Sequence, residues 1–217
     1  LYTLMVMIEV RLYGKETFWR NGGKSSPNAV TETKPLNNPG FIKITGNRNY
    51  VRFRQSGSTR IELLSLEGNI LSKLPIEQQG DTVSIDLSSF NPKIHYQLFF
   101  YLPEKEQLSI QAHEAYFKMN EIKLDRLHIN QRGGRGVISD DSKIAKIILT
   151  ASDTAKFEID QAYVDQISVN LNNSTFSVLT KAEELTGSMV NKSVLVAQNP
   201  KKLKYERDDS SVIRIIQ

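Results

Sequence analysis

Residues 156–160 read Lys-Phe-Glu-Ile-Asp, and residues 166–170 read Gln-Ile-Ser-Val-Asn. Apolar and polar residues alternate in both pieces, and a period of two is typical of strands rather than helices. Matching pieces recur about every 20 residues between Leu108 and Val196. A fixed period of this length indicates a repeat architecture, in which each repeat buries its apolar face against its neighbours.

Aligning the copies gives three ladders of equivalent residues, most of them apolar. The first contains Leu108/Ile110, Leu127/Ile129, Ile147/Leu149, Ile167/Val169 and Met189. The second contains Phe117/Met119, Val137/Ser139, Phe157/Ile159, Phe176/Val178 and Val194/Val196. The third contains Leu124, Ile144, Val164 and Leu185. Three ladders predict three short strands in each coil.

Turn-forming segments such as Asn172-Asn173-Ser174 separate these pieces, as short strands require. A unit of about 20 residues is too short for a helical repeat, and the Leu-x-x-Leu-x-Leu-x-x-Asn signature of leucine-rich repeats is absent. The sequence therefore predicts an all-β fold, a parallel β-helix in which each strand pairs with its equivalent one coil on.

The organisation predicted along the chain has two parts. Residues 1–40 are an N-terminal apolar segment and a linker, and residues 41–217 are a single β-helix domain. That domain has irregular, wider coils at 41–107, regular coils at 108–196 and a C-terminal cap at 197–217, where charges are dense. Strands are expected at 41–44, 50–54, 61–64, 83–87 and 96–101, either as early coils or as a sheet that covers the open N-terminal edge.

Residues 1–13 begin apolar and then carry Glu9 and Arg11. They are interpreted either as the end of a signal peptide or membrane anchor, or as a strand or short helix packed on the domain.

Composition narrows the range of partners. The 28 basic and 24 acidic residues give a net charge of +4 and are interspersed, so no nucleic-acid partner is expected. The chain has no cysteine, which excludes disulfides, thiol catalysis and thiolate metal sites. No cofactor and no metal is expected.

Three stretches match a known family in their order. They are Phe41-Ile42-Lys43-Ile44-Thr45-Gly46-Asn47, Val51-Arg52-Phe53-Arg54-Gln55-Ser56-Gly57 and Phe99-Phe100-Tyr101-Leu102-Pro103, followed by the coils after Leu108. Over about residues 41–216 the chain resembles the family described as "putative auto-transporter adhesin, head GIN domain". Asn199-Pro200-Lys201-Lys202 stands where members often carry a Gly-Asn-Pro turn, although the Ser-Gly-Ser-Gly turns of many members are missing.

This resemblance implies a right-handed parallel β-helix in an exported or surface-attached bacterial protein. It implies adhesion as the activity and supplies no catalytic residues.

Parallel β-helices also include polysaccharide lyases and pectinases, which work with carboxylates and basic residues. The residues that could serve such chemistry are His113, Glu114, Asp125, His128, Arg132, Arg135, Asp140 and Asp141. Alternation turns His128 outward between Leu127 and Ile129, and no spacing among the eight makes a metal site or a catalytic triad. The pattern favours a solvated surface, and no catalytic, cofactor or metal residue is assigned.

Two short motifs have two interpretations each. Arg132-Gly133-Gly134-Arg135-Gly136 could grip an anion with its guanidinium groups or could form a corner that needs positive φ; the corner is favoured. Asn172, Asn173 and Asn191 begin Asn-x-Ser/Thr triplets, for which turn formation is favoured over glycosylation.

The sequence thus predicts a non-catalytic cell-envelope or surface module, adhesin-like, that binds a glycan or another surface protein. The alternative is a carbohydrate-active β-helix enzyme. The expected location is the periplasm or the cell surface after export. A membrane tether through the N-terminus of a precursor and an oligomeric state are left open.

Overall fold

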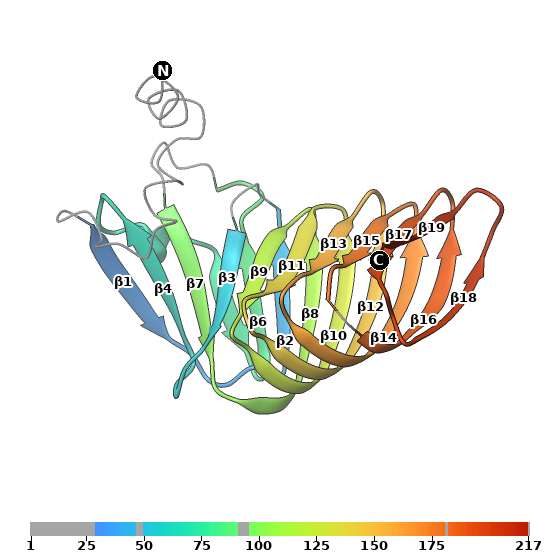
Figure 1. Ribbon diagram of the computed structural model, residues 1–217. Helices are drawn as coiled ribbons and strands as arrows, with labels where there is room; N and C mark the ends of the chain where they lie inside the picture. Colours follow the sequence, from blue (N-terminus) through green and yellow to red (C-terminus); the bar gives the residue numbers. More distant parts are fainter. Residues whose placement is uncertain (1–28, 47–49, 91–95, 181, 217) are drawn as a thin grey trace, which may run out of the picture.

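The structure, a computed structural model, describes residues 29–46, 50–90, 96–180 and 182–216. Its strands wind into a parallel β-solenoid with coils of about 20 residues, in which two sheets face each other across one apolar core (Figure 1). The predicted all-β solenoid is therefore confirmed. Residues 1–13, with their two interpretations, lie outside the described residues.

Each coil contributes one strand to each sheet. Sheet A runs in the order β1 (Val30–Pro35), β4 (Arg60–Ser65), β7 (Tyr96–Leu102), β3 (Tyr50–Gln55), β9 (Tyr116–Asn120), β11 (Arg135–Ser139), β13 (Lys156–Ile159), β15 (Thr175–Val178), β17 (Val194–Gln198) and β19 (Val212–Ile216). Sheet B runs in the order β18 (Lys202–Arg207), β16 (Ala182–Val190), β14 (Tyr163–Asn172), β12 (Lys143–Ser152), β10 (Lys123–Arg132), β8 (Lys105–His113), β2 (Phe41–Thr45), β6 (Thr82–Asp86) and β5 (Ile76–Gln79). A single 3-10 turn, Leu71–Lys73, joins β4 to β5 in the described chain.

The prediction of three strands per coil is wrong, because two of the three ladders lie on the same long strand. Leu124 and Leu127 both belong to β10 and both point inward. Between them Asp125 and Arg126 are both exposed, so the strand bends there, and Asp125 has no paired partner in β8 or β12. The same bend recurs in β12 and β14 and gives sheet B a corner along one side.

The aromatic ladder is continuous, but in one coil its inward position lies one residue earlier than predicted. Phe117 pairs with Gly136 and Gly136 with Phe157, whereas Val137 lies on the outer face opposite Lys118 and Glu158. The predicted place of Val137 in this ladder is therefore wrong. Gly136 has no side chain, and the ring centroids of Phe117 and Phe157 lie 6.0 Å apart across it. A Cβ at Gly136 would lie 2.4 Å from the Phe157 ring.

This ladder extends through both halves of the protein. Phe100, Phe53, Phe117, Phe157 and Phe176 stack in that order, with centroid distances of 5.4, 6.2, 6.0 and 6.0 Å. At its end Leu195 follows Phe176, in place of the predicted Val194. All five rings are fully buried, so they form the spine of the core.

The last two steps along sheet B, from β14 to β16 and from β16 to β18, are shorter than the steps before them, and two ladder assignments are wrong as a result. Ile167 pairs with Leu185 and Leu171 with Met189, a shorter step along the sequence than the preceding step from Ile147 to Ile167. Val164 pairs with Ala182. Leu185 therefore belongs to the first ladder, and Met189 continues the row of Leu171. Opposite Val169 stands Gly187, with a φ of 147°.

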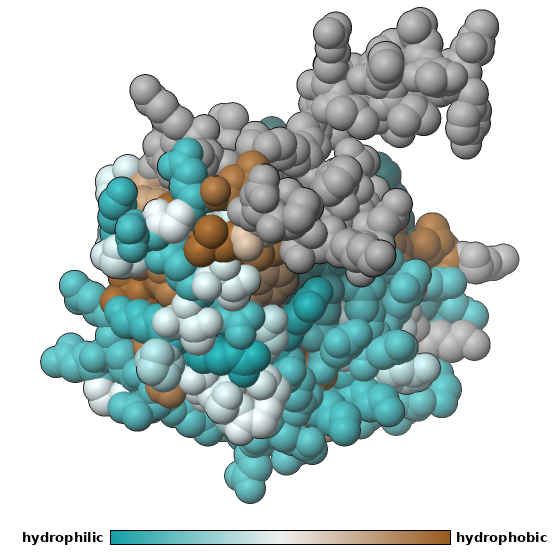
Figure 2. All heavy atoms as spheres, turned by 90° about the vertical axis from the view of Figure 1, so that its left-hand side faces the viewer, coloured by the Kyte–Doolittle hydropathy of each residue, from teal (hydrophilic) through white to brown (hydrophobic). Residues whose placement is uncertain are grey.

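The N-terminal half combines early coils with an antiparallel cover, so both alternatives hold in part. β2 and β3 pair in parallel on both sides, β2 with β6 and β8, and β3 with β7 and β9. Outside them, β4 and β1 extend sheet A and β5 extends sheet B, all antiparallel. Val30–Pro35 was expected within a linker, and this is wrong, because every residue of this strand pairs with β4. Figure 2 shows this end of the solenoid, with apolar atoms gathered in its upper part.

The charged run 201–209 lies in the last coil. β18 pairs in parallel with β16, and β19 pairs in parallel with β17. Tyr205 continues the inward row beyond Gly187, and burial raises the pKa of its hydroxyl. Its hydroxyl makes no hydrogen bond within the described residues.

Candidate functional site

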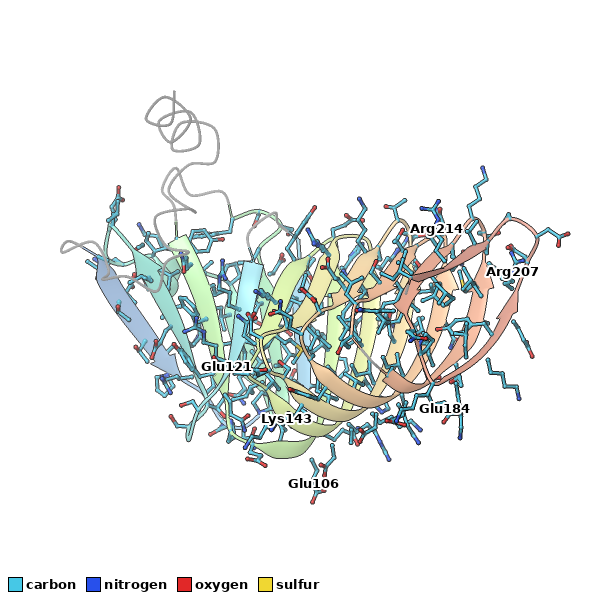
Figure 3. The ribbon with its side chains drawn as sticks, in the orientation of Figure 1. Glu106, Glu121, Lys143, Glu184, Arg207 and Arg214 are labelled. Carbon is cyan, nitrogen blue, oxygen red and sulfur yellow. The ribbon has the colours of Figure 1, made fainter. Side chains whose placement is uncertain are left out.

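An open groove follows the corner of sheet B where four successive long strands begin. Its volume is about 630 Å³. The lining residues come from the starts of β8, β10, β12 and β14: Glu104, Lys105, Lys123, Leu124, Asp125, Lys143, Ile144, Ala145, Tyr163 and Asp165. Lys143 marks this corner at the lower edge of the solenoid in Figure 3. The groove is a direct product of the strand bend, which turns two successive side chains outward.

One wall of the groove is a row of long side chains. Lys123 pairs with Lys143 and Lys143 with Tyr163, so the three follow one another on successive coils, about 4.8 Å apart along the solenoid axis. The Lys143 ammonium lies 5.8 Å from the centre of the Tyr163 ring. The Lys123 ammonium lies 4.0 Å from the Glu104 carboxylate. Tyr163 is 64% exposed, so most of its ring is open to a ligand.

The bend itself supplies the second row. Asp125, Ala145 and Asp165 occupy equivalent positions, all exposed, and none of them takes part in strand pairing. The two carboxylates are separated by two coils, which corresponds to about 10 Å along the axis. Ala145, between them, contributes no polar group to this row. The groove therefore offers ammonium donors, carboxylate acceptors and one aromatic face.

Lys105 has a structural task at one end of the groove. Its ammonium donates to Asn38 Oδ1 at 3.1 Å and to the carbonyl oxygen of Pro39. Burial lowers the pKa of Lys105, and the nearby Asp81 carboxylate acts in the opposite direction. This lysine ties the segment before β2 to the first long strand at that end of the groove.

Of the eight residues considered for carbohydrate chemistry, only Asp125 lines the groove. His113 and Arg132 pair at the C-terminal ends of β8 and β10, whereas the groove follows the beginnings of these strands. Glu114 occupies the turn after His113 with a φ of 50°. His128 points outward between Ser109 and Ile148 and is half-buried; its Nε2 makes no hydrogen bond within the described residues. The structure thus separates His113 and His128 from the groove.

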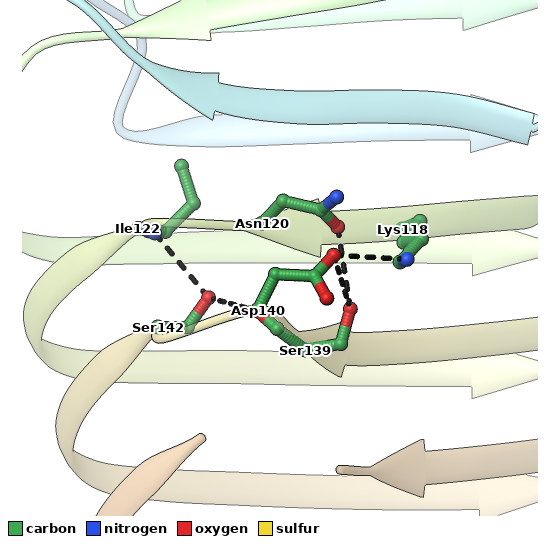
Figure 4. Close-up of polar contacts among 6 residues, drawn as sticks. All are labelled: Lys118, Asn120, Ile122, Ser139, Asp140 and Ser142. Carbon is green, nitrogen blue, oxygen red and sulfur yellow. Dashed lines mark hydrogen bonds and ion pairs between the residues drawn. The ribbon is translucent and has the colours of Figure 1, made fainter. Parts of the chain in front are cut away.

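Asp140 and Asp141 lie in the turn between β11 and β12, and Figure 4 shows the contacts of Asp140. The Lys118 ammonium contacts the Asp140 carboxylate at 3.1 Å, and the Ser139 hydroxyl donates to it at 3.2 Å. In the same turn Ser142 donates to the Ser139 carbonyl at 2.8 Å. These contacts fix the turn and leave Asp140 engaged within the protein.

The Gly-rich motif forms the corner that the sequence favoured. Gly133 and Gly134 have φ values of 64° and 66°, which residues with a Cβ rarely adopt. Arg132 Nε lies 2.5 Å from the Asp153 carboxylate, and Arg135 Nη2 lies 2.7 Å from that of Glu158. Both guanidinium groups are therefore paired with the next coil.

The Asn-x-Ser/Thr positions also serve the turns. Asn173 and Asn191 have positive φ, and the Asn191 side-chain amide donates to Asn172 Oδ1 at 2.7 Å. Stacked asparagines thus connect the turns of two coils.

Sequence reasoning missed the lysines and the tyrosine of the groove. Lys123, Lys143 and Tyr163 recur at one constant step along the sequence, which is the signal that could have found them. It also missed a cluster on the outer face of sheet A, where the Arg54 guanidinium lies 5.1 Å from the Phe99 ring and that of Arg60 lies 4.0 Å from the Tyr101 ring. Burial raises the pKa of Tyr101, and so does the adjacent Glu62 carboxylate.

No group of three or more His, Asp or Glu side chains within the described ranges could hold a metal ion. Across the same residues, no helix has the length and apolar character needed to cross a bilayer.

The sequence matches no family model, and no curated protein matches it. Solved structures do. A protein from Bacteroides fragilis described as a "putative adhesin" superimposes with a TM-score of 0.60 at 11% identity, covering 88% of this chain and 98% of that one. A protein from Parabacteroides distasonis described as a "putative lipid binding protein" gives 0.53 at 13% identity, with the same coverage. At such identities the likeness shows a shared solenoid fold.

Proposed function

We propose that this protein is a non-catalytic surface module that binds a glycan through the corner groove. The observation that carries this proposal is the exposed Tyr163 ring beside a row of lysines and a row of carboxylates. Sugars present apolar ring faces, which stack on aromatic side chains, and hydroxyl groups, which hydrogen bond to charged donors and acceptors. The three lysines and three carboxylates of the lining balance, which favours a neutral, hydroxyl-rich ligand.

An adhesin-like role on the outside of the cell follows from the same proposal. The description of the Bacteroides fragilis protein with the same fold supports it, as does the resemblance to the head GIN domain family. The proposed location is the cell envelope after export. The chain's lack of cysteine is compatible with that location.

One observation favours a second candidate, a glycoside hydrolase. The backbone positions of Asp125 and Asp165 are about 10 Å apart along the axis, close to the range of roughly 6.5–9.5 Å that separates the two carboxyl groups of inverting enzymes. Both carboxylates are exposed, however, in an open groove that does not enclose a substrate and exclude water from it. The groove therefore fits binding better than cleavage.

A glycan microarray probed with the 217-residue chain tests the proposal, followed by calorimetric titration of the best neutral oligosaccharide. Tyr163→Ala should weaken binding at least tenfold, because stacking on the ring is lost. Asp125→Asn and Asp165→Asn should each weaken it several-fold. Val190→Ala is the matched control, since Val190 is 41% exposed on β16, outside the groove.

Unchanged affinity in Tyr163→Ala would contradict the groove as the binding site. Release of shorter sugars from a bound oligosaccharide, abolished by Asp125→Asn, would replace the binding module with the hydrolase.

A further inference from the structure

The last coil leaves two strand edges without a partner in the described chain, β18 in sheet B and β19 in sheet A (Figure 1). The other end also has two edges, but they are polar: β1 reads Val-Thr-Glu-Thr-Lys-Pro and ends in proline, and β5 has four residues. Proline, charge and short length are the usual means of blocking an edge. β19 reads Val-Ile-Arg-Ile-Ile and has only one charge.

The exposed apolar side chains gather at this end. Of the eight large hydrophobic residues exposed in the described chain, four lie in the last coil: Leu203, Val212, Ile215 and Ile216. Ile213 and Ile215 continue the inward rows of Leu195 and Ala197, so no described residue covers the core of the solenoid at this end. A partner that fits must add a strand to β19 and also supply inward apolar side chains.

β18 restricts which strand can be added. Lys202, Lys204 and Glu206 point outward along it, and Arg207 takes the inward position beyond Met189, where its guanidinium donates to the Ser211 carbonyl at 2.6 Å. Charges on an edge reject most incoming strands. They admit a strand whose own charges are complementary at the same spacing.

A second copy of the chain satisfies this condition. In an antiparallel pairing of β18 with β18 of the second copy, centred on Tyr205, Lys204 of each copy lies opposite Glu206 of the other. In an antiparallel pairing of β19 about Arg214, Ile213 lies opposite Ile215 of the second copy. Tyr205 and Arg214 stand equally far from the turn between β18 and β19, so one two-fold axis passes close to both centres. Closed two-fold symmetry is the commonest arrangement of homo-oligomers.

We propose that two copies of this protein associate through their C-terminal ends, β18 with β18 and β19 with β19, into one continuous solenoid of double length. The pairing covers the open core and satisfies both edges at once. It places the two Arg214 side chains opposite each other on the outer face, where Figure 3 labels one of them. That like-charged pair is unfavourable, and the same register places the inward Arg207 of each copy opposite Leu203 of the other.

Sedimentation equilibrium of the 217-residue chain over a range of concentrations tests the proposal, and a mass twice that of one chain is expected. Glu206→Lys should raise the dissociation constant at least tenfold, because lysines then face each other. Adding Lys204→Glu to that variant should restore association, since the charges are exchanged and remain complementary. Arg214→Thr should tighten association several-fold.

Val190→Lys is the control for a new surface charge and should leave the dissociation constant unchanged. Thermal melting of each variant separates weakened association from loss of the fold. A single-chain mass at every concentration would overturn the proposal, and so would a mass that grows without limit or a double variant that fails to restore association.

Discussion

Residues 30–102 and residues 105–216 extend the same two sheets but are paired in different ways. In the second part each strand pairs with its equivalent one coil on, so one local pattern determines every pairing. In the first part β2 is inserted between β6 and β8, and β4 runs antiparallel to β7. Regular spacing allows strand pairing to be predicted from the sequence, whereas pairing between unlike segments produces no periodic pattern that could predict it. Both parts nevertheless share one aromatic spine.

The largest expected effect comes from a charge placed in that spine. Phe157→Asp would bury an unpaired carboxylate and should cost about 5 kcal/mol or prevent folding. Urea unfolding followed by circular dichroism measures it. Thr150→Asp, on the exposed face of β12, is the control and should stay within about 0.5 kcal/mol of the parent. A Phe157→Asp protein as stable as the parent would show that the inward row is misassigned.

A matched pair of truncations tests whether the two parts form one cooperative unit. Phe53→Ala lies in the first part and Phe157→Ala in the second, and both rings are fully buried. Each should cost about 3–5 kcal/mol of unfolding free energy while keeping a single transition. Differential scanning calorimetry distinguishes this from two separate transitions. Two transitions after Phe53→Ala alone would mean that the first part unfolds independently of the coils.

The shortened step from β14 to β16 provides the next test. A Cβ at Gly187 would lie 1.8 Å from the Val169 carbonyl oxygen, and the φ there is 147°. Gly187→Ala should therefore cost about 2–4 kcal/mol by thermal or urea unfolding. Gly57→Ala is the matched control, because no atom lies within 4 Å of its Cβ position. Equal stability of the two variants would contradict the register of β14 and β16.

The smallest effect concerns a turn of the first part. The hydroxyl of Ser88 donates to the Asp86 carboxylate at 2.6 Å and its amide donates at 2.9 Å, and together they lower the pKa of Asp86 below 3.8. This contribution to stability is complete above that pH and is lost as the pH falls through the lowered pKa. Ser88→Ala should raise the Asp86 pKa toward 3.8, as followed by NMR titration. An unchanged midpoint would mean that the amide acts alone.

The sequence was sufficient to predict the solenoid, because equivalent apolar residues such as Leu127, Ile147 and Ile167 repeat at nearly constant spacing. It could not place Val137, because Val137 and Ser139 alternate as plausibly as Gly136 and Ile138. A glycine carries no side chain to mark its face, and in a period of two a slip of one residue exchanges the two faces. Leu185 and Met189 were misplaced because the constant step of the earlier coils was imposed on a coil that is shorter.

The groove was harder to predict for a different reason. It depends on a bend where two successive residues face outward, and a strict alternation of inward and outward positions has no place for Asp125 and Asp165. The antiparallel strand β1 was missed because Val30–Pro35 is polar and stands beside turn-forming residues. Its partner β4 comes later in the sequence, after β2 and β3, so the pairing cannot be inferred from neighbouring residues.

The insertion of β2 and β3 has a consequence for biosynthesis. A ribosome completes these two strands early, yet their partners β8 and β9 end only at residues 113 and 120. Until then the nascent chain carries two apolar strands with unfinished neighbours on one side. Later coils, by contrast, can dock one at a time as they emerge. The two strands are therefore made well before they are enclosed, and a stall in translation before residue 120 would leave them exposed to aggregation.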